Sequence, residues 1–194
     1  FVVSARTSGG QFDHQGVSLF MVDARADGVS IKSYKTMDGQ RAATVTLTNV
    51  VVAEDQLLNA VGEGMDLVDQ VMPSMLMALS AEALGIMATL NSITVDYSKT
   101  RQQFGSPIGS FQVLQHRMVD TFMACEQAKS MLYRSLCQAN ECAADASLDK
   151  GELLKSVHAL KATMAKAGKQ IGEEAIQLHG GIGLTDELNI GHFV

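Results

Sequence analysis

Residues 153–178, LLKSVHALKATMAKAGKQIGEEAIQL, carry the pattern that predicts the fold of this chain. Apolar side chains recur there at spacings of three and four residues, which places them on one face of a long α-helix. These positions are Leu153, Val157, Leu160, Met164, Ala167, Ile171, Ala175 and Leu178. The preceding segment carries a similar stripe at Leu114, Met118, Phe122, Cys125 and Leu132. Two such faces joined by a short connection indicate antiparallel helices of a bundle.

The helical pattern extends in both directions from this stretch. Helices are predicted over roughly 64–98, 111–142 and 149–178. A fourth helix is expected to begin at Thr185, because Thr185, Asp186 and Glu187 supply a capping side chain and favourable charge for a helix N-terminus. The bundle, residues 54–194, is expected to be truncated in this last helix.

The first 53 residues have a β pattern. Val17–Val22 and Val29–Tyr34 are short apolar-rich runs bounded by glycine, and Thr44–Val51 is rich in β-branched residues. The predicted fold class is therefore α+β, with a small antiparallel β region over 1–53 followed by a long-helix antiparallel bundle over 54–194.

Composition excludes several function classes. Apolar residues make up 46% of the 194 residues, enough for a core, and the net charge of −6 comes without the basic cluster of a nucleic-acid surface. No apolar run reaches the ~18 residues of a membrane span. The three cysteines show no CxxC spacing, which favours reduced thiols in the cytoplasm, and the five histidines show no metal-ligand spacing.

The segment between the first two predicted helices, Arg101-Gln102-Gln103-Phe104-Gly105, is the first candidate site. The guanidinium fork of Arg101 suits the paired oxygens of a pyrophosphate, and Phe104 can lie against a flat ring. Gly105 is expected to end the helix. An ordinary helix C-terminus is the alternative, since Arg and Gly are common there.

A second candidate follows the last long helix, Gln177-Leu178-His179-Gly180-Gly181-Ile182-Gly183. The backbone N–H groups of these glycines could approach an anion, aided by the N-terminus of the following helix. Gln177 would add a neutral donor and acceptor. A glycine-rich linker is the alternative, and the absence of a preceding strand excludes a Rossmann fingerprint.

Together the two motifs resemble the flavin-binding signatures of the acyl-CoA dehydrogenase family. The first runs Tyr97-x-x-x-Arg101-x-Gln103-Phe104-Gly105-x-x-Ile108-x-x-Phe111-Gln112. Residues 81–85, AEALG, are similar to the family's first bundle helix. The resemblance implies the end of a middle β domain plus most of a C-terminal four-helix bundle. It also implies FAD as cofactor and a homo-oligomer, dimer or tetramer, or a heteromeric partner subunit.

The resemblance also implies the site residues. Arg101, Gln103 and Phe104 would contact the FAD of a neighbouring subunit, with Gln112 as a further candidate. Gln177, Gly180 and Gly181 would contact its adenosine-pyrophosphate part. The implied reaction, in fatty acid metabolism, is α,β-dehydrogenation of an acyl-CoA thioester with hydride transfer to FAD.

No catalytic residue can be assigned by this resemblance. A family Glu removes the α-proton from one of two places, of which one lies beyond Val194 and the other corresponds to Met75 or Leu76, neither of which moves a proton. Glu82 lies about two turns from Met75 and is not expected to substitute. Three interpretations stay open. The chain is a fragment of the enzyme, inactive alone; or a non-catalytic subunit or helical assembly module contributing to a partner's FAD site; or a helical interaction module that has lost flavin.

Overall fold

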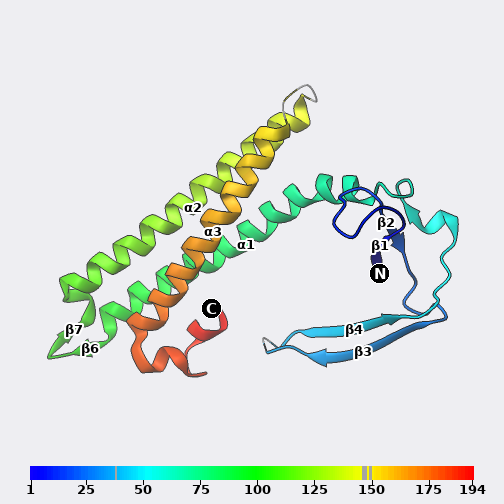
Figure 1. Cartoon of the computed structure of the whole chain (residues 1–194). Coiled ribbons are helices and arrows are strands. Elements are labelled where there is room, and N and C mark those ends of the chain that lie inside the picture. Colours follow the sequence, from blue (N-terminus) through cyan, green and yellow to red (C-terminus); the bar gives the residue numbers. More distant parts are fainter. Residues whose placement is uncertain (38, 146–147, 149) are drawn as a thin grey trace. The chain divides into compact units, whose positions relative to one another are not determined.

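The computed structural model describes residues 1–37, 39–145, 148 and 150–194 (Figure 1). The chain divides into two compact units, Phe1–Met72 and Pro73–Val194. Helix α1 (Gly64–Thr100) begins in the first unit and continues through the second. The domain boundary expected between residues 53 and 54 stays a prediction.

The first unit contains two small antiparallel sheets. In one, β2 (Val17–Met21) pairs with β1 (Val2–Arg6) and with β5 (Leu57–Leu58). In the other, β3 (Val29–Lys35) pairs with β4 (Arg41–Leu47) over their whole length, and the short 3-10 helix η1 (Glu54–Gln56) precedes β5. The predicted strands at 17–22 and 29–34 are confirmed as β2 and β3.

The predicted strand Thr44–Val51 is displaced in the structure, because β4 begins at Arg41 and ends at Leu47. Beyond it, Asn49 has a φ of 51°, in the left-handed region that no strand residue adopts. Asn tolerates this conformation better than other non-glycine residues. The β-branched pattern thus indicated a strand but could not place its end.

The second unit is built on three long helices, as predicted. They are α1, α2 (Gln112–Ala144) and α3 (Lys150–His179), which lie close to the predicted ranges. The predicted start of the third helix at residue 149 lies outside the described residues. Helices α2 and α3 run antiparallel, side by side (Figure 1). Deep between them, the hydroxyls of Ser135 and Ser156 are hydrogen-bonded at 2.9 Å.

The predicted apolar face of α3 forms the centre of the core. All of its members are buried except Leu153, which is half-buried and packs against the cluster of buried apolar residues that forms the bundle core. Helix α1 contributes Met77, Met87 and Leu90 to this cluster. Burial of a continuous helical face accounts for most of the stability of such a bundle, because helix propensity alone is weak.

On α2 the prediction was wrong at Phe122, whose side chain is 60% exposed. The buried face is made mostly of small residues, Thr121, Cys125, Ala128 and Ser135, together with the larger Leu132. Small side chains let α2 approach α3 closely, as the serine–serine hydrogen bond shows. Sequence reasoning had followed side-chain size, whereas the helix-to-helix distance selected small residues.

The predicted fourth helix is not present in the described residues. The chain after α3 forms two 3-10 helices, η3 (Gly180–Leu184) and η4 (Asn189–His192). Thr185 ends η3, and its hydroxyl donates backwards to the carbonyl of Ile182 at 2.9 Å. Among the described hydrogen bonds, no backbone N–H ahead of Thr185 donates to this hydroxyl, and the next helical turn, η4, begins after Leu188.

Helix α1 is long and apolar enough to cross a membrane by length and composition alone. A core helix of a soluble protein meets the same test, so this finding does not by itself indicate insertion. The absence of a membrane span stays a prediction.

Candidate functional site

One end of the bundle brings the two sequence motifs together around a single cavity of about 560 Å³. The end of α1, the segment that follows it, the start of α2 and the end of α3 all contribute to its lining. Six of the seven predicted site residues line it: Arg101, Gln103, Phe104, Gln177, Gly180 and Gly181. The seventh, Gln112, is the first residue of α2 and is not among the described residues that line the cavity.

The segment after α1 is a tight β-hairpin. Strand β6 (Gln102–Gln103) pairs with β7 (Ser106–Pro107), and the two connecting residues, Phe104 and Gly105, have φ values of 54° and 81°. Positive φ at both central residues is the geometry of the hairpin turn that matches strand twist. Gly105 therefore does not end the helix, which stops at Thr100; it makes the turn.

The hairpin presents Phe104 to solvent. Its side chain is 93% exposed, and its main described ring contact is an edge-on contact with Phe111, with centroids 6.1 Å apart. A non-glycine residue at positive φ is strained, and an exposed aromatic ring gains little from folding. Neither backbone preference nor burial explains a phenylalanine here.

Arg101 is fixed by its backbone and free at its side chain. Its N–H donates to the carbonyl of Tyr97 at 2.9 Å, and its own carbonyl accepts from the N–H of Ile108 at 2.8 Å. Within the described part of the chain, its guanidinium has no ion-pair or hydrogen-bond partner. A planar, permanently charged fork is thus held at the cavity with its donors uncommitted.

The three glycines after α3 differ in whether the backbone or a close neighbour requires a glycine. Gly180 has a φ of 67°, and a Cβ on Gly183 would lie 3.0 Å from the carbonyl oxygen of Ile176. Gly181 has neither constraint, because nothing lies within 4 Å of the position of its Cβ. The surface at Gly181 is therefore open to close approach by a group from outside the chain. The glycines lie within the short η3, and the helix expected to begin at Thr185 is not formed, so the dipole of a following α-helix does not assist here.

His179 and Tyr97 join α3 to α1 beside the glycines. Their rings stack with centroids 4.3 Å apart, and the Tyr97 hydroxyl donates to the His179 carbonyl at 3.4 Å. The His179 side chain is 4% exposed, and its Nδ1 lies 2.7 Å from the carbonyl of Ala175. Because a carbonyl only accepts, Nδ1 carries the hydrogen. The ring stacking and the Tyr97 hydroxyl bond fix the end of α3 against α1, while the Nδ1 contact within α3 holds the His179 ring in place.

Residues 62–194 match the family model for the acyl-CoA dehydrogenase C-terminal domain. The chain belongs to the acyl-CoA dehydrogenase family. Acyl-CoA dehydrogenase IpdE2 of Mycolicibacterium smegmatis is 32% identical over 85% of this chain and 48% of its own length. The mitochondrial short-chain specific acyl-CoA dehydrogenase of Homo sapiens is 25% identical over 90% of this chain and 41% of its own length.

Solved structures of relatives have the same fold. PigA, solved with FAD and proline, superposes with a TM-score of 0.87 at 25% identity, covering 100% of this chain and 49% of PigA. The chain therefore spans about half the length of the relatives it matches.

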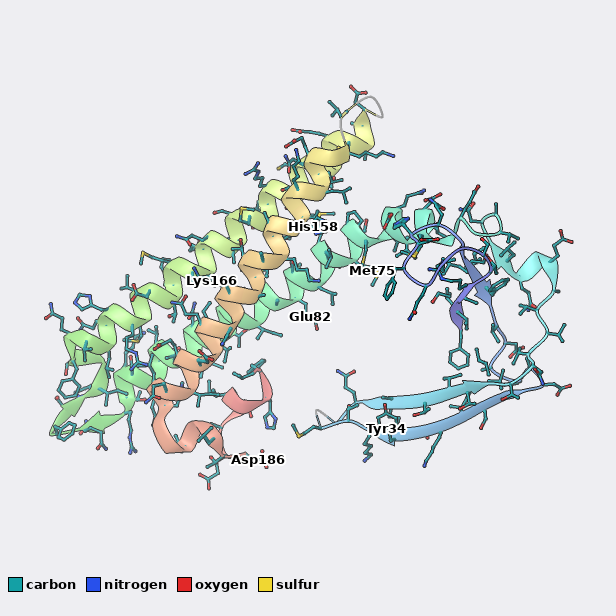
Figure 2. The ribbon with its side chains drawn as sticks, viewed as in Figure 1. Tyr34, Met75, Glu82, His158, Lys166 and Asp186 are labelled. Carbon is teal, nitrogen blue, oxygen red and sulfur yellow. The ribbon has the colours of Figure 1, made fainter. Side chains whose placement is uncertain are left out.

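The two positions considered for a base, Met75 and Leu76, are apolar and lie on α1 well before Tyr97 at the cavity. Figure 2 shows Met75 and Glu82 on α1, where both are exposed, while Leu76 packs against the core cluster. From Glu82 to Tyr97, at the cavity, α1 rises roughly 20 Å. No Asp or Glu is among the described residues that line the cavity.

Sequence reasoning missed one charged residue of the cavity, Arg117 on α2. Its Nε donates to Oε2 of Glu174 on α3 at 2.6 Å. No short motif contains both residues, because they are far apart in the sequence. The available signal was weak: Arg117 follows Phe111-Gln112 of the first motif by less than two helical turns.

Proposed function

We propose that this chain is the bundle portion, with part of the β region, of an FAD-dependent acyl-CoA dehydrogenase. The observation that carries the proposal is the single cavity in which Arg101 and the hairpin meet the Gly180-Gly181 turn. A dinucleotide needs cationic donors for its phosphates and a surface without side chains for close approach. The uncommitted guanidinium of Arg101 and the open surface at Gly181 fit these needs.

The residues have separate roles in this proposal. Arg101 donates hydrogen bonds to phosphate oxygens, and Gly180 and Gly181 let the backbone lie close to the ligand. Phe104 lies against a ring, while Gln103 and Gln177 offer neutral donors and acceptors. FAD, when bound, supplies the hydride-accepting chemistry for α,β-dehydrogenation of an acyl-CoA thioester. The role of this chain is to bind and orient the cofactor.

Proton removal needs a base, and at the position on α1 that the resemblance gives for one this chain has Met75 and Leu76, which carry no proton-transfer group. We therefore propose that the 194-residue chain alone has no turnover and that acyl-CoA is a substrate of the complete enzyme. The proposed setting is fatty acid metabolism in the cytoplasm, in a homo-oligomer, dimer or tetramer, in which Arg101 and the glycine turn reach the FAD of a neighbouring subunit.

A second candidate function is a non-catalytic subunit, or a helical assembly module, that contributes to a partner's FAD site. The observation that favours it is the apolar pair Met75 and Leu76, where a base or another polar residue is expected. Co-expression with a catalytic relative tests it, because a stable flavin-containing heteromer is expected. Isolation of the chain without any partner would count against it.

Two measurements test the leading proposal. Titration of the purified protein with FAD should quench flavin fluorescence, and FAD should bind more tightly than riboflavin, which lacks the phosphates. Oxidation of acyl-CoA thioesters with an artificial electron acceptor should be absent for this chain alone. Failure to bind FAD at saturating concentration would overturn the flavin proposal, and measurable oxidation would overturn the absence of a base.

A further inference from the structure

Arg117 is a second arginine in the cavity, and it comes from a different element than Arg101. Arg101 follows the end of α1, whereas Arg117 projects from the second turn of α2. The Arg117 side chain is 35% exposed and that of its partner Glu174 is 28% exposed. Both side chains are therefore partly removed from water. A hydrogen bond between charged groups is stronger in such surroundings than at the fully exposed surface.

The hydrogen bonds of Arg117 leave most of its donors available. A guanidinium carries five N–H donors in a plane. Among the described residues, the Arg117 side chain makes one hydrogen bond, which its Nε donates to Glu174 at 2.6 Å. The terminal nitrogens are thus without a partner on a half-buried group that lines a cavity. At 35% exposure these donors can be hydrated, and no described protein group holds them away from an incoming ligand.

The carboxylate of Glu174 also fixes the direction of the fork. A bond at Nε holds the plane of the guanidinium and leaves its two terminal nitrogens as a pair, the arrangement that matches two oxygens of a phosphate. The lining of the cavity, as far as it is described, contains two arginines and no carboxylate. An anionic ligand in the cavity would therefore meet cations from two different elements, the end of α1 and the start of α2.

We propose that Arg117 is a second phosphate-binding residue for the flavin dinucleotide, and that Glu174 is the residue that positions it. This inference rests on the proposed function, since it concerns the same cavity. In this arrangement Arg101, at the end of α1, and Arg117, on α2, hold the diphosphate between them. The competing interpretation is a purely structural ion pair that ties α2 to α3.

The test compares FAD with riboflavin on variants of the full chain. In Arg117→Gln the affinity for FAD should fall about 10-fold or more, the size expected for losing a charge-assisted hydrogen bond. The affinity for riboflavin should not change, because riboflavin has no phosphate. Arg117→Lys keeps the charge but not the fork, so it should recover only part of the FAD affinity.

Two further variants complete the design. Glu174→Gln should weaken FAD binding less than Arg117→Gln, because it loosens the fork without removing it. Arg134→Gln is the matched control: Arg134 lies exposed on the same helix, outside the cavity lining, and its loss changes the net charge equally. FAD affinity should be unchanged in this control, so a general charge effect can be recognised.

The outcomes separate the inference from the function on which it rests. If the wild-type protein does not bind FAD, the proposed function fails. If it binds FAD more tightly than riboflavin and Arg117→Gln binds as the wild type does, the inference alone is wrong. A lower melting temperature in Arg117→Gln with an unchanged ratio of FAD to riboflavin affinity would show a structural tie and would also overturn the inference.

Discussion

Replacement of Leu160 tests whether the α3 face is the centre of the fold. Leu160 is 0% exposed and belongs to the cluster that joins α1, α2 and α3. In Leu160→Ala, the side-chain atoms beyond Cβ are lost from a site that its neighbours fill from three helices. Because close-packed surroundings relax only partly, the variant should carry a cavity as well as the lost transfer free energy.

The expected loss in free energy of unfolding is about 2–5 kcal/mol, the range measured for buried leucines. Small domains have total stabilities of about 5–15 kcal/mol, so this is a large share. Each kcal/mol lowers the melting temperature by roughly 2–4 °C in a chain of this size, which gives a decrease of about 10 °C.

Leu154→Ala is the matched control, because it removes the same atoms from the same helix at a side chain that is 40% exposed. It should cost about 1 kcal/mol or less. Urea unfolding followed by far-UV circular dichroism measures both variants. The midpoint should fall in Leu160→Ala, while the dependence of the free energy on denaturant stays constant, since the folded state is unchanged in extent.

Equal destabilisation by Leu160→Ala and Leu154→Ala would refute the assignment of the buried face. The stronger change Leu160→Asp should prevent folding of the bundle, because it buries a charge without a partner. A native melting profile for that variant would refute the same reasoning independently.

Three further predictions concern the site and the cysteines. Arg101→Ala should lower FAD affinity about 10-fold through loss of charge-assisted hydrogen bonds, and unchanged flavin content would contradict this role. Gly181→Ala should leave the melting temperature unchanged, because the added Cβ meets no neighbour, yet it should weaken FAD binding by filling the open surface. Gly183→Ala should instead lower the melting temperature, because the added Cβ would lie 3.0 Å from the carbonyl oxygen of Ile176. Burial raises the pKa of the Cys125 thiol, so the stability linked to its protonated form is kept at neutral pH and declines only as alkaline pH is reached. A maleimide reagent should therefore label the exposed Cys137 in the native protein but Cys125 only after unfolding, and rapid native labelling of Cys125 would contradict its burial.

The helices could be predicted because their signal is local. A seam of apolar residues with helical period is a property of consecutive positions, so α1, α2 and α3 were located closely from the sequence. The stripe on α2 was only partly right, because Phe122 satisfied the period but the distance to α3 selected the small Thr121. That distance depends on both helices together.

The turns were harder to predict, since several conformations suit the same residues. Gly105 is typical of a helix end, but here Phe104 and Gly105 share a hairpin turn. Thr185 is typical of a helix start, but its hydroxyl bonds to the preceding turn. In each case a hydrogen bond or a strand pairing a few residues away decided between the alternatives.

By itself, the sequence determined the fold class, the three long helices and the two motifs with their chemical character, because periodicity and side-chain type are written along the chain. Only the tertiary structure decided that the two motifs border one cavity and that Arg117, held by Glu174, stands there with them. The physical reason is that packing of α3 against α1 and α2 brings distant residues together, and no local pattern encodes that distance.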